Sequence, residues 1–123
     1  MEENSKPTIL KSFACAFRGV KEAFLSERNV RIHFALATLA IILGLCLKIS
    51  SVEWLFLCVV ISVVLITEFI NTAVEKILDL VYKGQNGKVR FIKDVFAGVV
   101  LIAAISSLVI GGIIFLPKIF QLF

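Results

Sequence analysis

Three long apolar stretches alternate with polar segments along this chain. The first runs over residues 32–49, the second begins at residue 52, and the third covers residues 95–116. A helix needs about 20 predominantly apolar residues to cross roughly 30 Å of hydrocarbon. The pattern therefore predicts three transmembrane helices, which we place at about residues 32–49, 51–82 and 88–120.

The second and third predicted helices extend beyond their apolar cores. Apolar residues continue at helical spacing from Ile66 to Leu80, now with charged residues between them. At 1.5 Å per residue, a helix over 51–82 is roughly 48 Å long, well over the thickness of one bilayer core. The segment 84–87, Gly-Gln-Asn-Gly, is typical of a turn, so the third helix is expected to begin near residue 88.

A shorter stretch before the first span, about residues 8–29, has a different pattern. Its large apolar residues recur every three or four positions and are Ile9, Phe13, Phe17, Val20 and Phe24. On a helical wheel they fall within about 80°, and the charged residues lie opposite. This is typical of a helix that lies in the headgroup region of a membrane. A packed cytosolic helix is the alternative, but the sequence offers no other soluble segment to pack against it.

Composition and charge agree with a membrane protein. The 123 residues are 59% hydrophobic with a mean hydropathy of +1.00, and a soluble domain of this size could not bury so much apolar surface. The net charge is +4, and most basic residues form two blocks, one of Lys6, Lys11, Arg18, Lys21, Arg28 and Arg31 and one of Lys76, Lys83, Lys88, Arg90 and Lys93. Because both blocks flank apolar runs, they indicate membrane orientation and no nucleic-acid partner. The positive-inside rule then predicts a cytoplasmic N-terminus and an external C-terminus.

Four polar residues form one stripe where the second predicted helix leaves the membrane. Glu68, Asn71, Glu75 and Asp79 are three or four positions apart, so they project within about 80° of one another. The stripe climbs roughly 16 Å, comparable to an extended ATP molecule. A solvated helix face would explain Asp79 and Glu75. It explains Glu68 poorly, because an ionisable group at the membrane boundary is expensive and is a functional candidate.

Other charged residues are expected at the same membrane surface. Glu27 ends the amphipathic stretch, and the pair Lys93-Asp94 opens the third span. Carboxylates can hold Mg²⁺, a lysine can offset phosphate charge, and one carboxylate can accept a proton from an attacking hydroxyl. The chain contains neither a P-loop nor a kinase glycine-rich loop, so an ATP site would have to be built from helix side chains.

The pattern Glu68-x-x-Asn71-Thr72-Ala73-x-Glu75-x-x-x-Asp79, followed by Lys93-Asp94, resembles the signature of the prokaryotic diacylglycerol kinase family, which includes the undecaprenol kinases. The resemblance covers nearly the whole chain. It implies an all-α integral membrane protein with a surface helix and three spans, assembled as a homotrimer with active sites shared between neighbours. The stretch from Glu27 to His33 is more similar to the undecaprenol-kinase branch.

The resemblance also implies a reaction and its residues. The enzyme would transfer the γ-phosphoryl group of MgATP to a lipid alcohol, diacylglycerol or undecaprenol, at the cytoplasmic face of a bacterial membrane. Glu68 would be the general base, and Asn71 would help to position the reacting groups. Glu27 and Glu75 would bind ATP through Mg²⁺. The remaining positions that contact the nucleotide or complete the site would be Asp79, Lys93 and Asp94.

Several points stay open at this stage. Ile92, Phe96 and Val99 are large where the family usually has small residues, which leaves the packing of the third helix open. His33 is either an interfacial anchor or a catalytic group. Two other functions compete with a kinase: a non-catalytic membrane subunit held together by the polar stripe, and an ion or proton carrier that uses Glu68. The charged positions beyond the membrane core favour the kinase.

Overall fold

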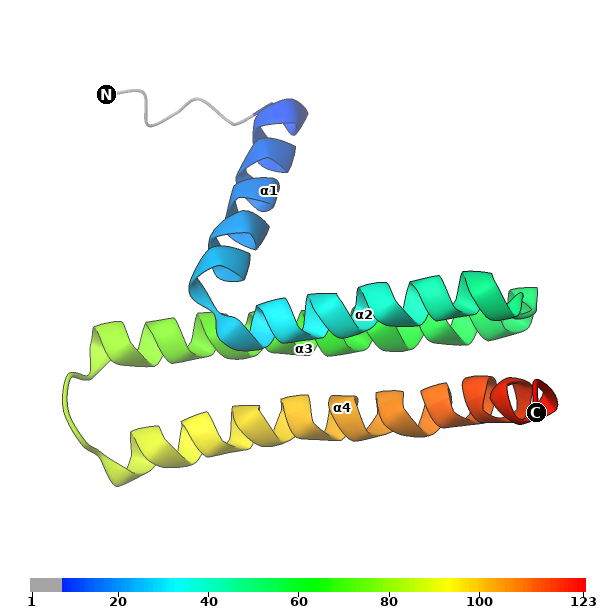
Figure 1. The fold of residues 1–123 in the computed structure, drawn as a ribbon. Helices are drawn as coiled ribbons and strands as arrows, with labels where there is room; N and C mark the ends of the chain where they lie inside the picture. Colours follow the sequence, from blue (N-terminus) through cyan, green and yellow to red (C-terminus); the bar gives the residue numbers. More distant parts are fainter. Residues whose placement is uncertain (1–7) are drawn as a thin grey trace.

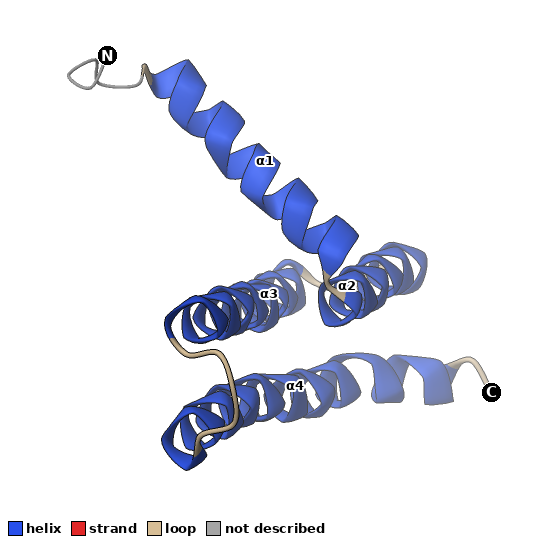
Figure 2. Ribbon diagram, turned by 90° about the vertical axis from the view of Figure 1, so that its left-hand side faces the viewer, coloured by secondary structure: helices blue, strands red, loops and turns tan. Residues whose placement is uncertain are grey.

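The computed structural model describes residues 8–123, which fold into four α-helices: α1 (Ile9–Ser26), α2 (Arg28–Leu47), α3 (Ser51–Val81) and α4 (Gly87–Gln121). Lys6 of the first basic block lies outside the described residues. Helices α2, α3 and α4 run alongside one another, and α1 leaves the start of α2 at a steep angle (Figures 1 and 2). Each of α2, α3 and α4 is long and apolar enough to cross a membrane, which confirms the all-helical class and the number of candidate spans.

The turn between α2 and α3 makes these helices antiparallel neighbours. Lys48 ends α2 in the left-handed conformation, with φ of 52°, and the Ile49 N–H donates to the Gly44 carbonyl at 3.2 Å. Ser50 then caps α3: its hydroxyl accepts from the Glu53 N–H at 3.2 Å, and the Glu53 carboxylate accepts from the Ser50 N–H at 2.9 Å. This capping box satisfies backbone donors that a helix start leaves without partners.

The chain breaks between α1 and α2 at Glu27, whose backbone is extended. Hydropathy alone had put this boundary between residues 29 and 32, because it detects where apolar residues become continuous and not where the backbone turns. The Arg31 guanidinium donates to the carbonyl oxygens of Phe24 at 2.9 Å and Leu25 at 3.0 Å. Arg31 thereby satisfies carbonyls that the last turn of a helix leaves free.

Helix α4 continues through Pro117 to Gln121, whereas its apolar run ends at Leu116. A proline inside a helix removes one backbone hydrogen bond and disturbs the preceding turn. Because Pro117 lies in the last turns, the disturbance affects little of the helix. At the other end, the Asn86 side chain caps α4 by accepting from the Lys88 N–H at 2.8 Å.

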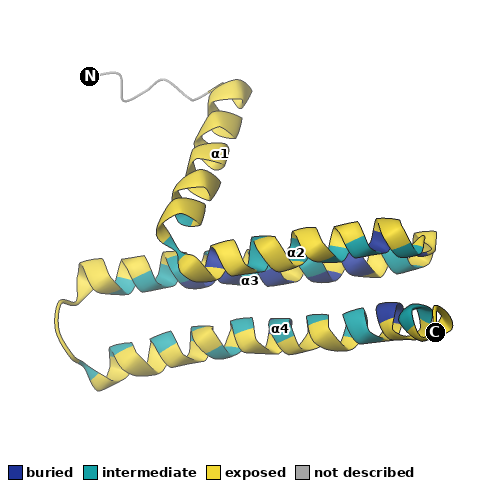
Figure 3. Ribbon diagram, viewed as in Figure 1, coloured by how far each residue is buried: buried dark blue, intermediate teal, exposed yellow. Residues whose placement is uncertain are grey.

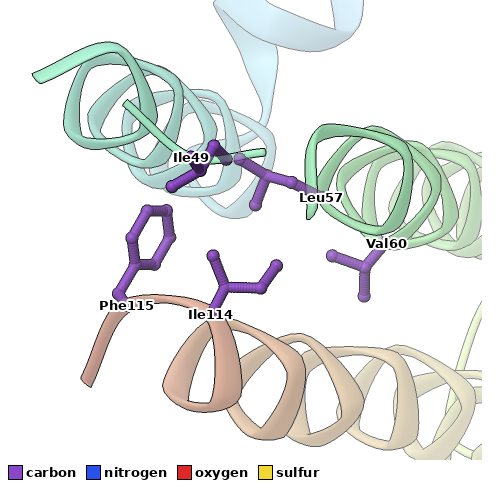
Figure 4. Close-up of a cluster of buried hydrophobic side chains, with 5 residues drawn as sticks. All are labelled: Ile49, Leu57, Val60, Ile114 and Phe115. Carbon is purple, nitrogen blue, oxygen red and sulfur yellow. The ribbon is translucent and has the colours of Figure 1, made fainter. Parts of the chain in front are cut away.

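The buried core gathers near the α2–α3 turn. It consists of Ile49 in the turn, Leu57 and Val60 on α3, and Ile114 and Phe115 on α4, which face one another in Figure 4. Gly44 on α2 is buried against Trp54, and a Cβ at this position would lie 2.8 Å from the ring atom Cη2. The close approach of α2 and α3 at this end therefore requires the absence of a side chain at residue 44.

Most of the apolar surface stays exposed in the single chain (Figure 3). Helix α1 buries none of its residues, and large side chains such as Ile102 and Leu108 on α4 are mainly exposed. Apolar faces of this extent are unfavourable in water. They suit a chain whose helices are covered by lipid or by other subunits.

Candidate active site

The predicted polar stripe lies on one uninterrupted helix, α3, and its exposure rises along the helix. Glu68 and Asn71 are buried, Glu75 is half-buried, and Asp79 is exposed. Because α3 and α4 extend past the start of α2 (Figure 1), the outer part of the stripe has neighbours on only one side. The stripe therefore leads from the interior of the bundle to its polar end.

Glu68 makes its ion-pairing contact with α2. Its Oε2 atom lies 3.6 Å from Nε2 of His33, and the side chains are only 4% and 17% exposed. Both residues lie roughly four to five helical turns from the α2–α3 turn, so antiparallel packing brings them to the same level. The sequence had left the role of His33 open, and counting turns from this loop would have paired it with Glu68.

Asn71 contains an oxygen that has no partner among the described residues. Its Nδ2 group donates to the Glu75 carboxylate at 3.4 Å, whereas its buried Oδ1 atom accepts no hydrogen bond. An unsatisfied buried polar atom costs about 1–3 kcal/mol. Such an atom beside a carboxylate is a natural place for a ligand to bind.

Glu27 reaches α3 because the chain breaks at this residue. Its carboxylate lies 3.5 Å from Nζ of Lys76, the residue next to Glu75. The contact brings the α1–α2 junction to the middle of the polar stripe. Lys76 was not among the predicted site residues, although its place beside Glu75 on the sequence could have suggested it.

The two residues of the Lys93-Asp94 pair make contacts with different helices. Nζ of Lys93 donates to Asp79 at 2.8 Å and so joins α3 to α4. Asp94 is exposed and pairs with Arg90 at 3.5 Å along its own helix. Within one chain the structure thus brings Lys93 to the stripe, whereas the contact of Asp94 stays within α4.

The described residues contain no cluster of three or more His, Cys, Asp or Glu side chains that could hold a metal ion. The stripe does offer hard oxygen atoms, namely the Glu75 carboxylate and the partner-free Oδ1 of Asn71. Mg²⁺ is commonly bound by one or two carboxylates together with substrate phosphates. The side chains present therefore fit Mg²⁺ that arrives with a nucleotide.

An apolar cavity of about 290 Å³ lies between α2, α3 and α4, with His33 at one end. It runs along α2 from His33 to Leu43, a distance of roughly 15 Å, and reaches Leu57 and Phe115 beside the buried core. Ser107 and His33 are its only polar lining residues in the described part of the chain. The cavity thus leads along apolar side chains to His33, which contacts the buried acid Glu68.

A buried acid, a graded polar stripe and an apolar cavity within one bundle are features expected of a membrane protein that acts on a lipid. Comparison with known proteins gives the family. Residues 14–115 match the family model described as prokaryotic diacylglycerol kinase. The chain belongs to this family and is a lipid kinase in a bacterial membrane, which confirms the resemblance seen in the sequence.

Individual relatives carry two names. An undecaprenol kinase of Bacillus subtilis is 36% identical over 115 residues, covering 94% of each chain. A diacylglycerol kinase of Synechocystis is 35% identical over 117 residues, covering 94% of this chain and 67% of the relative. The diacylglycerol kinase of Escherichia coli K12 is 25% identical over 104 residues, covering 82% of this chain and 83% of the relative. The family therefore favours a kinase over a non-catalytic subunit or an ion carrier.

Proposed function

We propose that this protein transfers the γ-phosphoryl group of MgATP to the primary hydroxyl of a membrane lipid alcohol. The product is a lipid phosphate: undecaprenyl phosphate from undecaprenol, or phosphatidate from diacylglycerol. The observation that carries the proposal is the position of Glu68, a buried acid near the end of an apolar cavity and at the inner end of a polar stripe.

The cavity and Glu68 bind different parts of the lipid. The hydrocarbon part lies along the apolar lining, and the hydroxyl lies at the His33 end beside Glu68. Glu68 accepts the hydroxyl proton while the lipid oxygen forms its bond to the γ-phosphorus and the bond to the ADP oxygen breaks. An acid at the inner end of the stripe is the one that a lipid headgroup can reach.

The outer part of the stripe binds the nucleotide. Lys93 exchanges its contact with Asp79 for phosphate oxygens, and Asp79 and Asp94 complete the binding surface. Asn71 uses its partner-free oxygen to position the reacting groups. Glu27 and Glu75 would hold Mg²⁺, which would neutralise phosphate charge on the nucleotide.

Helix α1 lies on the cytoplasmic membrane surface in this proposal, and the active site faces the cytoplasm. Two observations support this arrangement. The side chains of Phe13 and Phe17 are exposed on α1, as a lipid-facing helix requires. Phe24, Phe34 and Phe69 then connect α1, α2 and α3 through edge-to-face contacts, with ring centroids 5.6 and 6.2 Å apart.

The active enzyme is a homotrimer in which neighbouring chains complete each site. Three observations support a site that one chain leaves incomplete. The apolar faces of α4 are exposed, Asp94 pairs only with Arg90 on its own helix among the described residues, and the Asn71 oxygen has no partner among them. Crosslinking in mild detergent should give trimers, and mixing two differently inactivated variants should restore part of the activity. Fully active monomers would contradict this assembly.

The function is tested with purified protein in mixed micelles and ATP labelled at the γ-phosphate. Undecaprenol and diacylglycerol are supplied in parallel, with Mg²⁺ or with a chelator. We expect label in the lipid only with Mg²⁺, and more with undecaprenol, because the end-to-end match to the Bacillus enzyme and the Glu27–His33 stretch favour that branch. ATP consumption without an added lipid alcohol, or no labelling of either lipid, would contradict the proposal.

A further inference from the structure

His33 faces the interior of the bundle and not the surrounding membrane surface. Its side chain is 17% exposed, lines the cavity between α2, α3 and α4, and lies 3.6 Å from the Glu68 carboxylate. A histidine that served only as an interfacial anchor would direct its ring toward the headgroups. The ring of His33 instead stands where the cavity meets the buried acid.

Glu68 depends on this contact because a buried carboxylate needs a donor. Removing a charged group from water costs several kcal/mol unless a partner compensates. Among residues 8–123, His33 is the only ion-pairing partner of Glu68. The lysines that contact the α1–α2 junction and the outer stripe are engaged there, Lys76 with Glu27 and Lys93 with Asp79, and the Asn71 amide donates to Glu75.

From this geometry we propose that His33 is a positioning residue for Glu68 in phosphoryl transfer. Nε2–H of His33 donates to one carboxylate oxygen of Glu68, which leaves the other oxygen for the lipid hydroxyl. The proton of the hydroxyl passes to Glu68, and His33 exchanges no proton. A separation of 3.6 Å is longer than an N–H···O hydrogen bond, and such bonds in ligand-free sites often shorten when substrate binds.

The inference rests on the proposed role of Glu68 and adds a second residue to it. It predicts that His33 acts on the chemical step and not on nucleotide binding, since the residues proposed to bind the nucleotide lie further out, Asp79 on the stripe and Lys93 beside it on α4. It also predicts that the effect of His33 is exerted through Glu68. Two residues that act as one unit give strongly non-additive losses when both are changed.

The test uses full-length protein with undecaprenol and with diacylglycerol as acceptors. His33→Leu removes the donor and keeps an apolar side chain in the cavity, whereas His33→Gln keeps an N–H donor without a titratable ring. Thr38→Val on the same helix is the matched control, because Thr38 is exposed and its hydroxyl donates to the Phe34 carbonyl within the helix. We expect kcat to fall about 10²-fold in His33→Leu, with KM for ATP unchanged. His33→Gln should recover most of this loss, and Thr38→Val should match the parent protein.

The double variant separates positioning from a purely structural role. Adding His33→Leu to Glu68→Gln should lower kcat no further than Glu68→Gln alone. An unchanged kcat in His33→Leu, an additive loss in the double variant, or a loss that appears mainly in KM for ATP would overturn the inference. Near-normal kcat in Glu68→Gln would instead contradict the proposed function of Glu68, so the two failures are distinguishable. If His33→Leu does not fold, His33→Gln decides: a loss of kcat as large as that of Glu68→Gln would overturn the inference.

Discussion

The two ends of the bundle differ in packing and polarity, although the same helices form both. At the end that contains the α2–α3 turn, Gly44 lets Trp54 pack closely. A buried apolar core joins the three helices there and consists of Ile49, Leu57, Val60, Ile114 and Phe115. At the polar end, the buried amide oxygen of Asn71 has no partner among the described residues, and the Glu68–His33 and Glu27–Lys76 pairs are 3.6 and 3.5 Å apart. Local rules of packing and polar satisfaction are broken mainly at functional sites, so this difference agrees with the proposal that substrates bind at the polar end.

Glu53 and Glu68, both on α3, differ in the same way in the partners of their carboxylates. The Oε1 atom of Glu53 accepts from the Ser50 backbone N–H and lies 3.1 Å from Nζ of Lys118, so this carboxylate joins the α2–α3 turn to the end of α4. Glu68 has only His33 within ion-pairing distance among the described residues. The difference agrees with the proposal that Glu68 acts in the reaction, whereas the contacts of Glu53 stabilise the turn.

The largest effect is expected for Glu68→Gln. The substitution keeps the size of the side chain and removes the proton acceptor, and loss of a positioned base usually lowers kcat by about 10²–10⁴-fold. Steady-state kinetics should show this fall with ATP binding largely kept. Glu53→Gln, on the same helix, is the control and should retain normal kcat. Equal kcat values for Glu68→Gln and Glu53→Gln would contradict a catalytic role that is confined to the polar end.

Glu75→Gln should raise the requirement for Mg²⁺ and lower turnover. Even the outer partners of metal ligands cost about 10–100-fold when they are changed, so loss of a ligand is expected to cost at least as much. The concentration of Mg²⁺ at half-maximal rate and the binding of Mn²⁺-ATP, followed by electron paramagnetic resonance, measure this effect. Wild-type Mg²⁺ dependence would show that Glu75 does not bind the metal.

At the tightly packed end, Gly44→Ala should destabilise the protein without slowing the reaction. The new Cβ would lie 2.8 Å from Trp54 Cη2 and 3.1 Å from Ile49 Cδ1, so a ring or a helix has to shift. Overpacking of this kind costs about 1–3 kcal/mol. Thermal unfolding in detergent measures the change, and kcat at low temperature should stay normal.

Gly19→Ala is the matched control for that prediction, because among the described residues no atom beyond the local helix backbone lies within 4 Å of a Cβ at residue 19. Replacing an exposed helical glycine by alanine should stabilise α1 by up to about 1 kcal/mol. If Gly19→Ala lost as much stability as Gly44→Ala, the contact with Trp54 would not explain the destabilisation of Gly44→Ala.

The smallest effect is expected for Lys118→Met, which removes the ion pair with Glu53. Partly exposed pairs contribute about 0–1 kcal/mol, so unfolding should shift little and KM for ATP should not change. Lys93→Met removes the corresponding lysine at the polar end and should raise KM for ATP clearly. An equal effect of both variants on ATP would contradict the assignment of nucleotide binding to one end.

The sequence by itself determined the spans and the order of the polar stripe. Both follow from local periodicity: apolar runs long enough to cross a bilayer, and polar residues repeated every three or four positions on α3. These features depend on helix geometry alone, so Glu68, Asn71, Glu75 and Asp79 were predictable as one face. The sequence also placed Glu27 at the end of the amphipathic stretch, but not the extended backbone at this residue, because hydropathy does not report where the chain turns.

Only the tertiary structure decided which residues of different helices meet. The contacts of His33 with Glu68, Glu27 with Lys76 and Lys93 with Asp79 each depend on the register of two helices, which the turns and the packing of Gly44 set. The cavity between α2, α3 and α4 likewise exists only after the helices have packed. Local spacing places side chains on a face, whereas the distance between two faces depends on how every intervening side chain fills the bundle.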